Sequence, residues 1–556
     1  MSKKNQRKGI FAVVGAVAIV AIGGSYLWAR TIIGKELSPA EAAEMVPEEA
    51  WMATYISTKS KSWSKLTEFG SNKAKDMLDE ELDYVSRQLS SNDIDYHKDI
   101  EPWLGSMMIA TFPPDEGKSM MKQENLNVLG VLGIKNKFEA GMFINKKIKG
   151  KVNSNDLNDF QERIYKGVII IETKTPTNEL LNTALMDDRL IMASNREVMN
   201  KTIDTIQGGR SFEDKIKEQE MVPKKLGKQT TLIKIYMPDY ATLMKTSLRS
   251  SPKTRLAART VDKINDVEAI MMGVGVNDRG IHFQTLAKLK EEENRQRTRR
   301  IPGDILSSLP NNTIALVNVE NLDRTWSSLL DRAAKDRILK FNLNKYKKSF
   351  ETSMNLDLDR DVFSWMDGEF ALALIPADRG FLADYGLAGM AMWTTSDRSR
   401  AEETLKKLEA KTESFNDISV RKRNLNGTEI TEWINFQGKD ILSYGWVDDS
   451  SLLLTFGTPP DQTLDIQANK SISKDKTFTT VTSYLPKTNQ GYLYINNLDA
   501  IIAVLDRLFE DTSYSVIPEA RAALTSVEAI AVTTSEPKPF FSQLDIMVSL
   551  KSNNKN

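Results

Sequence analysis

The chain repeats itself along its length, and this internal duplication constrains its fold more than any other feature. The motif Trp-Ser-x-Leu at residues 63–66 recurs at residues 326–329, an offset of 263 (326 − 63). The segment Val-Glu-Ala-Ile at residues 267–270 recurs letter for letter at residues 527–530, an offset of 260 (527 − 267). Because the offset changes so little, the sequence predicts one fold of about 250 residues present twice in tandem.

The sequence favours an α+β fold class, with two tandem copies of one mainly antiparallel sheet-plus-helices domain. Predicted strands outnumber helices and mostly follow one another in adjacent pairs, which is typical of antiparallel sheets. The predicted divisions are a cytoplasmic N-terminus at 1–8, a transmembrane helix at 9–29, a connector with a short helix at 30–46, a first repeat at 47–290, a charged linker at 291–305, a second repeat at 306–551 and a polar tail at 552–556.

An apolar segment near the N-terminus predicts a single transmembrane helix that precedes both repeats. Four basic residues precede an uncharged run from Gly9 to Ala29. As a helix this run reaches about 32 Å, which is enough to cross a bilayer core. The basic flank favours a cytoplasmic N-terminus, so the rest of the chain is expected on the far side of the membrane. A signal peptide cleaved near Gly23-Gly24-Ser25 is the alternative, but the apolar run is longer than an ordinary signal core.

Composition and charge exclude several functional classes. Lys and Arg together number 75, as do Asp and Glu, so there is no global basic field to gather nucleic acid. The chain has no cysteine, which excludes disulfides and any Cys/His zinc site. Its 40% hydrophobic and 27% charged residues are typical of globular domains with cores of their own.

The first repeat contains signals for a short helix and a series of strands. Ser38-Pro39-Ala40-Glu41 has the spacing of a capping box and predicts a helix that starts there. A helix with an apolar face is expected over residues 78–89, and a hairpin over 185–194 with its turn at Asp187-Asp188. Alternating apolar residues predict the other strands at 51–57, 106–112, 127–134, 165–172, 267–276 and 281–289.

The second repeat starts at Pro310 and retraces the same order of elements. A long helix is expected from Trp326 to Leu339, and an amphipathic helix passes through Ala401, Leu405 and Leu408. Strands are expected at 313–319, 370–375 and 387–393. Residues 230–289 and 490–550 are expected to share one order of strand, helix, strand and strand.

The residues that could carry catalysis or bind a cofactor are few. His97 and His282 are the two histidines of the chain, and neither lies near a nucleophile motif, so both are expected at the surface. Gly130, Gly133 and Gly141 lack the spacing of a phosphate-binding loop. We therefore predict no catalytic residue, no cofactor and no metal ligand.

One duplicated motif combines aspartate, tryptophan and glycine, with a hydrophobic-Asp-x-x-basic-Asp-hydrophobic-x-x-Trp pattern before the glycine. Its residues are Asp99, Trp103 and Gly105 in the first repeat, and Asp361, Trp365 and Gly368 in the second. In the structural interpretation the aspartates cap a short turn, the tryptophans fill the core and the glycine admits the next strand. In a functional interpretation the carboxylates are ligands or acids. The structural one is favoured because capping duties survive in both copies, whereas an active site need not.

Two charged segments also suggest sites. Asp357-x-Asp359-x-Asp361 starts like a calcium loop, but Val362 stands where the loop requires glycine and Gly368 where it requires glutamate. The arginines of residues 295–300 could bind anionic lipid headgroups, although the acidic residues just before them offset their charge. A solvated linker is the favoured interpretation of that segment.

Taken in order, these motifs resemble a family of uncharacterised membrane-anchored proteins that is common in cyanobacteria and catalogued only as a domain of unknown function. The resemblance rests on Pro47 and Pro310 before the first strand of each repeat, the two Trp-Ser-x-Leu motifs, the stretch from Asp99 to Gly105 and the paired Asp-Asp hairpins. It implies a cyanobacterial source and a place on the lumenal or periplasmic side of the thylakoid or plasma membrane. It implies no catalytic residue. The second copy departs from the pattern, with Ser364 where the first has Pro102.

The functional interpretation is a non-catalytic, membrane-anchored binding or scaffolding protein. Its expected partners are the lipid bilayer, through residues 9–29, and another membrane or envelope protein. Two alternatives stay open: a carrier for a lipid, pigment or other apolar ligand, and a carboxylate-dependent hydrolase of envelope polymers. The carrier would contain a large apolar pocket. The hydrolase would place two carboxyl groups across a cleft, one of them with a raised pKa.

Overall fold

The structure of the protein is a computed structural model that describes fifteen stretches of the chain. They are residues 37–58, 65, 69, 96–114, 127–143, 160–174, 180–186, 188–221, 230–249, 264–290, 303–412, 415, 417–461, 470–508 and 524–551. The chain divides into two compact units. Unit 1 contains Met1–Asn294, Pro537–Gln543 and Ser552–Asn556, and unit 2 contains Arg295–Glu536 and Leu544–Lys551.

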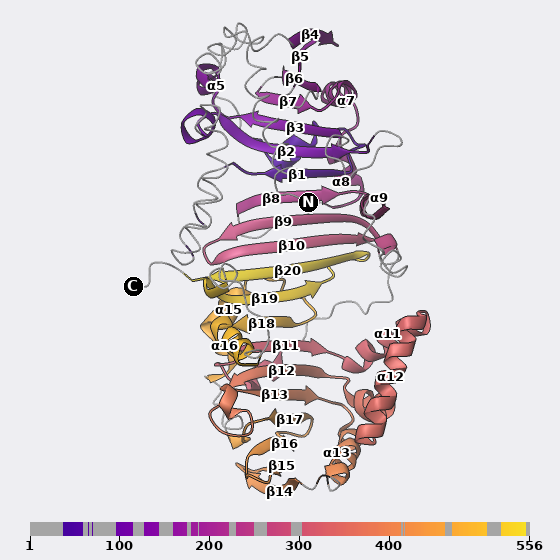
Figure 1. The fold of residues 1–556 in the computed structure, drawn as a ribbon, viewed down its shortest axis with the longest axis vertical. Coiled ribbons are helices and arrows are strands. Elements are labelled where there is room, and N and C mark those ends of the chain that lie inside the picture. Colours follow the sequence, from indigo (N-terminus) through magenta and orange to yellow (C-terminus); the bar gives the residue numbers. More distant parts are fainter. Residues whose placement is uncertain are drawn as a thin grey trace. The chain divides into compact units, whose positions relative to one another are not determined.

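The described strands belong to one antiparallel sheet of 20 strands (Figure 1). The expected fold class, two tandem copies of one sheet-plus-helices domain, is therefore wrong, because the strands of both copies belong to a single sheet. Alternating apolar residues predict strands but do not show where a sheet ends, because the free N–H and C=O groups of an edge strand can pair with a further strand. Residues 9–29 lie outside the described part of the chain. Among the described helices, none is both long and apolar enough to cross a bilayer.

In the described part of the chain, the first half of the sheet contains ten strands. The strands are β1 Met52–Ile56, β2 Leu104–Phe112, β3 Asn127–Ile134, β4 Phe160–Tyr165, β5 Val168–Lys174, β6 Leu180–Met186, β7 Arg189–Ala193, β8 Thr230–Met237, β9 Val267–Asn277 and β10 Gly280–Leu289. The helices are α2 Pro39–Ala43, η2 Tyr96–Ile100, α5 Lys137–Phe143, α7 Arg196–Ile206, α8 Phe212–Glu218 and α9 Tyr240–Arg249. The strands pair in the order β10-β9-β8-β1-β2-β3-β7-β6-β5-β4.

The second half also contains ten strands. They are β11 Ala315–Glu320, β12 Glu369–Pro376, β13 Leu387–Thr394, β14 Ile418–Leu425, β15 Thr428–Asn435, β16 Asp440–Trp446, β17 Ser451–Phe456, β18 Tyr492–Asn496, β19 Val527–Ser535 and β20 Phe541–Leu550. The helices are η5 Asp304–Ser308, α11 Leu322–Ala334, α12 Arg337–Met354, η6 Leu358–Val362, η7 Phe363–Trp365, η8 Ala383–Tyr385, α13 Arg398–Thr412, η10 Ile472–Lys474, α15 Lys476–Thr482 and α16 Leu498–Leu508.

The strands of the second half pair in the same order as their counterparts in the first. That order is β20-β19-β18-β11-β12-β13-β17-β16-β15-β14. The segments 230–289 and 490–550 each contain a strand, a helix and two strands, as the duplication predicts. The repeated sequence therefore encodes a repeated strand order within the one sheet.

Side chains alternate between the two faces of the sheet, and unit 2 has a core on each face. On one face Leu316, Ala373 and Tyr494 are neighbours across β12, β11 and β18 and belong to one buried cluster. On the opposite face Trp365, Trp433 and other aromatic side chains form a second cluster beneath α13. Alternation produces these two faces because successive residues of a strand point in opposite directions.

Two predicted elements differ from those observed. The strand predicted at 165–172 is a hairpin of β4 and β5, whose turn residues Lys166 and Gly167 have φ angles of 47° and 80°. Two successive positive φ angles reverse the chain and end the strand. The helix predicted from Trp326 to Leu339 is two helices, because Asp336 accepts the N–H groups of Ile338 and Leu339 and starts α12. The predicted capping box of Ser38 and Glu41 at α2 is confirmed.

Candidate functional site

The duplicated tryptophans occupy equivalent buried places in the two halves. Trp103 is 2% exposed and Trp365 is 4% exposed. The indole Nε1–H of Trp103 donates to the carbonyl oxygen of Asp99 at 2.7 Å, and that of Trp365 donates to the carbonyl oxygen of Asp361 at 3.0 Å. The predicted role of both rings as buried core side chains is confirmed.

The glycine that follows each tryptophan sits where the backbone approaches another strand. A Cβ atom on Gly105 would lie 2.9 Å from the carbonyl oxygen of Gly133 on β3. A Cβ atom on Gly368 would overlap the carbonyl oxygen of Thr394 on β13. Any side chain at these positions would force β2 or β12 away from its neighbour.

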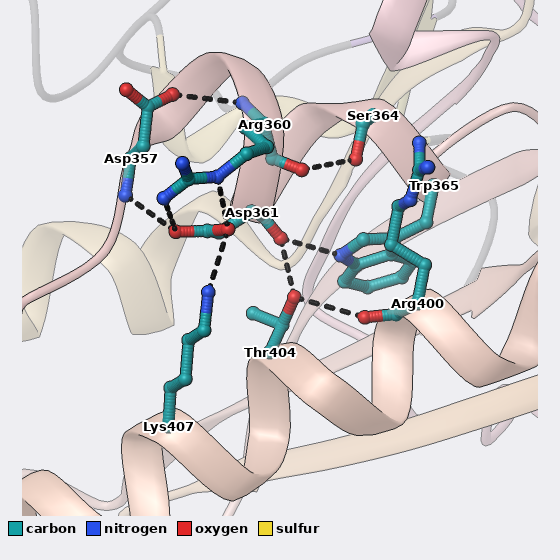
Figure 2. Close-up of polar contacts among 8 residues, drawn as sticks. All are labelled: Asp357, Arg360, Asp361, Ser364, Trp365, Arg400, Thr404 and Lys407. Atoms are coloured by element: carbon teal, nitrogen blue, oxygen red, sulfur yellow. Dashed lines mark hydrogen bonds and ion pairs between the residues drawn. The ribbon is translucent and has the colours of Figure 1, made fainter.

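The Asp361 carboxylate holds the second copy of the motif together (Figure 2). It accepts the backbone N–H of Asp357 at 2.9 Å, the Nε–H of Arg360 at 3.0 Å and the Nζ–H of Lys407 at 2.9 Å. Its main-chain carbonyl accepts the hydroxyl of Thr404 on α13. The hydrogen bond from Arg360, with those from Lys407 and the Asp357 amide, holds the pKa of Asp361 well below its ordinary value despite burial. This carboxylate joins η6 to α13 and is neutralised by its neighbours.

The aspartates of the calcium-like pattern point to different partners. Asp357 accepts the backbone N–H of Arg360 at 2.8 Å and caps η6. Asp359 accepts the indole N–H of Trp326 at 2.7 Å and an N–H of Lys347. Burial acts to raise the pKa of Asp359, but these two hydrogen bonds outweigh it and the pKa is lowered. Among the described residues no group of three or more His, Cys, Asp or Glu side chains could hold a metal ion.

The histidine expectation is wrong for one residue. His282 lies on β10 and is buried, because strand alternation places it on the same face as the buried Leu286. The side chain of His97 and the arginine segment 295–300 lie outside the described part of the chain.

The structure shows a second duplicated arrangement that sequence reasoning missed. Glu172 on β5 is buried and pairs with Arg163 on β4 at 2.9 Å. Glu432 on β15 is buried and pairs with Arg423 on β14 at 2.6 Å. Both the glutamates and the arginines are 260 positions apart (432 − 172 and 423 − 163), so the repeat offset contained the signal. A buried glutamate without such a cation would leave an uncompensated charge, and each pair connects the two strands of its hairpin.

A carboxyl pair near Glu432 meets one part of the hydrolase criterion and fails another. Asp440 on β16 has a raised pKa, first because of burial and then because of the negative charge of Glu432. Both carboxyl groups are buried within the sheet, and Glu432 is held by Arg421 and Arg423. The pair therefore does not face a substrate across a cleft.

The clearest candidate for a binding surface is a row of exposed apolar side chains on the sheet of unit 2. Leu372 on β12 is 48% exposed, Val317 on β11 is 37% exposed and Leu493 on β18 is 41% exposed. Val317 is the cross-strand partner of both others, and Leu493 faces the half-buried Val532 on β19. These four residues form a continuous strip, which we call the second open row.

The first half carries an open row at the equivalent positions. Ile109 on β2 is 37% exposed and Met272 on β9 is 39% exposed. Thr54 on β1 and Ile235 on β8 lie between them, and all four are successive cross-strand partners. Ile109 corresponds to Leu372 at an offset of 263 (372 − 109). We call this strip the first open row; apolar strand residues were predicted here, but not their exposure.

The chain belongs to a family of unknown function. The family described as "Protein of unknown function (DUF3352)" matches residues 10–550. This confirms the family of unknown function that the motif order suggested. No curated protein matches the chain.

Solved structures show only a distant likeness. "Structure of crystal form I of TP0453" is 10% identical, with a TM-score of 0.25, and the alignment covers 46% of this chain and 81% of that one. "Structure of crystal form III of TP0453" is 10% identical, with a TM-score of 0.26, and the alignment covers 46% and 82%. At these TM-scores the likeness carries no argument about fold or function.

Proposed function

We propose that this member of the DUF3352 family is a non-catalytic binding or scaffolding protein, whose open rows contact an apolar surface of another protein. The observation that carries the proposal is the second open row, in which Leu372, Val317 and Leu493 are exposed on adjacent strands. Contiguous exposed apolar side chains on a folded protein mark interaction surfaces. Their burial against a partner contributes about 25 cal/mol for each Å² removed from water.

The shape of the open rows favours a protein partner over a small apolar ligand. Neighbouring strands lie about 4.8 Å apart, so side chains that are direct cross-strand partners form a shallow strip on a pleated surface. A carrier instead encloses most of its ligand in a concave pocket. A strip of this kind matches the apolar side of a helix or strand of another protein.

The charged clusters support binding rather than acid catalysis. Asp361, Glu172 and Glu432 are each buried and each contact at least one arginine at 3.0 Å or less. The oxygens of each carboxylate are occupied by ion pairs and hydrogen bonds to neighbouring side chains. These groups serve to connect elements, which leaves the open rows as the surface available to a partner.

We further propose that the protein is found in the periplasm or the thylakoid lumen of a cyanobacterium. Its partner there is a membrane or envelope protein. Its support is the order of motifs described above. Fractionation of the source cells tests it: the protein should be found with the membrane and periplasmic or lumenal fractions. Recovery of the protein in the cytoplasmic fraction would contradict both the proposed location and the proposed envelope partner.

Site-specific photocrosslinking tests the proposed binding surface. A benzophenone amino acid at Leu372 or Ile109 should give the same protein adduct in living cells, identified by mass spectrometry. The matched control is Gln437, an exposed residue in the turn between β15 and β16, which should give no such adduct. Adducts with lipid or pigment alone would favour the carrier, and the absence of any adduct at both positions would overturn the proposal.

A further inference from the structure

The helical hairpin of α11 and α12 presents a surface that the open rows do not explain. Figure 1 shows the two helices at the end of strand β11, where the chain leaves Glu320 and enters α11 at Leu322. Over its whole length α12 has no buried residue, although it is the longest helix among the described residues. Its outer side is therefore open to contact with another surface.

The exposed side of α12 carries large apolar side chains. Ile338 and Phe341 are each 69% exposed and Tyr346 is 71% exposed. Ile338 and Phe341 lie in the first turns of the helix, directly after the turn that joins it to α11. The half-buried Leu339, Leu343 and Phe350 share another, inner side of the helix. The outer apolar residues therefore cluster toward the tip of the hairpin.

Cationic side chains surround this apolar tip. The segment of α12 contains five basic residues and one acidic residue. Lys345 and Lys348 lie on the same side of the helix as Phe341, at i+4 and i+7 from it, and Lys340 belongs to the same first turns but projects from another side. In the part of the chain that the structure describes, Lys340, Lys345 and Lys348 are exposed and form no ion pair. Their charge is available to an external partner.

One acidic residue contacts both helices of the hairpin. Asp359 accepts the indole N–H of Trp326 on α11 and an N–H of Lys347 on α12. Trp326 also stacks on Phe363 of η7, with their ring centroids 4.4 Å apart. These contacts fix the end nearest the sheet, so the tip with Ile338 and Phe341 extends as a preformed element.

We infer that the α11–α12 hairpin docks on an anionic lipid surface, with Ile338 and Phe341 inserted among the acyl chains and Lys340, Lys345 and Lys348 at the headgroups. An amphipathic helix with exposed aromatic and aliphatic residues beside lysines has the composition of an interfacial helix. Charge complementarity selects anionic over zwitterionic lipid, since each cation near such a surface contributes about 1 kcal/mol. This surface is separate from the open rows, so the inference does not depend on the proposed function.

A fluorescent probe at the tip tests the inference in the full chain. The chain has no cysteine, so Phe341→Cys labels with a nitrobenzoxadiazole dye at one position. Vesicles of phosphatidylcholine with phosphatidylglycerol should blue-shift the dye and raise its emission several-fold, whereas pure phosphatidylcholine should not. The same dye at Gln437→Cys is the position control and should show neither change. Because the dye reports its own surroundings, attachment of vesicles elsewhere on the chain gives no signal.

Charge reversal separates lipid docking from unspecific adhesion. Lys340→Glu, Lys345→Glu and Lys348→Glu together should weaken the response to anionic vesicles at least about tenfold. The matched control reverses three exposed lysines elsewhere in unit 2, Lys406, Lys476 and Lys487, and should leave the response unchanged. Circular dichroism melting confirms that both variants are folded. No response at position 341, an equal response to neutral vesicles, or an equal loss in the control variant would each overturn the inference.

Discussion

Trp365 shows how one residue stabilises a repeated element. Its ring is buried in an aromatic cluster, and its indole N–H satisfies the carbonyl oxygen of Asp361. We expect Trp365→Ala to lower the free energy of unfolding by about 3–5 kcal/mol, because it leaves a large cavity. Trp365→Phe keeps most of the packing but loses the indole hydrogen bond. We expect it to lower the free energy of unfolding by about 1 kcal/mol, in addition to the effect of repacking around the smaller ring. Urea denaturation followed by circular dichroism measures both, and an alanine variant as stable as the parent would refute the core role.

Asp361 makes stability depend on pH in the acidic range. Its pKa is lowered in the folded state, first by the hydrogen bond from Arg360. The stabilisation is therefore complete above the unfolded-state pKa, about 3.9, and is lost as the pH falls below it. We expect Asp361→Asn to be less stable than the parent at pH 7 and the difference to shrink as the pH falls below about 4. Melting temperatures of both proteins across this pH range measure the difference. A difference in stability that grows on acidification would contradict the expected direction of the pH dependence.

Gly368 tests the close approach of β12 to β13. We expect Gly368→Ala to cost on the order of 1–3 kcal/mol of unfolding free energy, because its Cβ would overlap the Thr394 carbonyl oxygen. Gly130→Ala is the matched control, since the nearest atom to a Cβ there lies 3.6 Å away. Thermal melting of the two variants compares them. Equal stability would show that the strands adjust freely.

The α11–α12 hairpin is connected to η6 through Asp359. We expect Asp359→Ala to increase amide hydrogen exchange in α11 and α12, because both helices lose a bond at their base. The global melting temperature should change little, since α12 has no buried residue. Asp449→Ala, a substitution at an exposed turn, is the control and should leave exchange in both helices unchanged. Unchanged exchange after Asp359→Ala would show that other contacts hold the hairpin.

The sequence predicted most elements where local signals were strong. The α2 capping box and the hairpin turn near Asp188 follow from residue types with defined roles in caps and turns. The missed boundaries have local causes as well, since Asp336 starts a new helix and Lys166-Gly167 turns the chain. Both signals are present in the sequence. The apolar periodicity continues across these residues, however, and therefore predicts one uninterrupted element.

The duplication predicted the repeated strand order but not the single sheet. Strand pairing between distant segments depends on backbone N–H and C=O groups that nearly all residues share, so residue types do not reveal which strands pair. Exposure of the open rows was equally hidden, because Leu372 and Leu316 look alike as strand residues. By contrast, the equivalence of Glu172 and Glu432 could have been predicted from the sequence, because they are separated by the repeat offset.

We propose that the open rows bind a protein partner and that the buried charges stay within the fold. The most direct test is the apparent size of the tagged chain in native size-exclusion chromatography of a cell extract, compared with two variants. Leu372→Glu with Leu493→Glu should abolish a complex formed by the parent, because a charge at an apolar interface stays unpaired and desolvated. Glu432→Gln, studied at a temperature where it is folded, should keep the complex. A double variant that retains the full-sized complex, or a folded Glu432→Gln that loses it, would contradict the account.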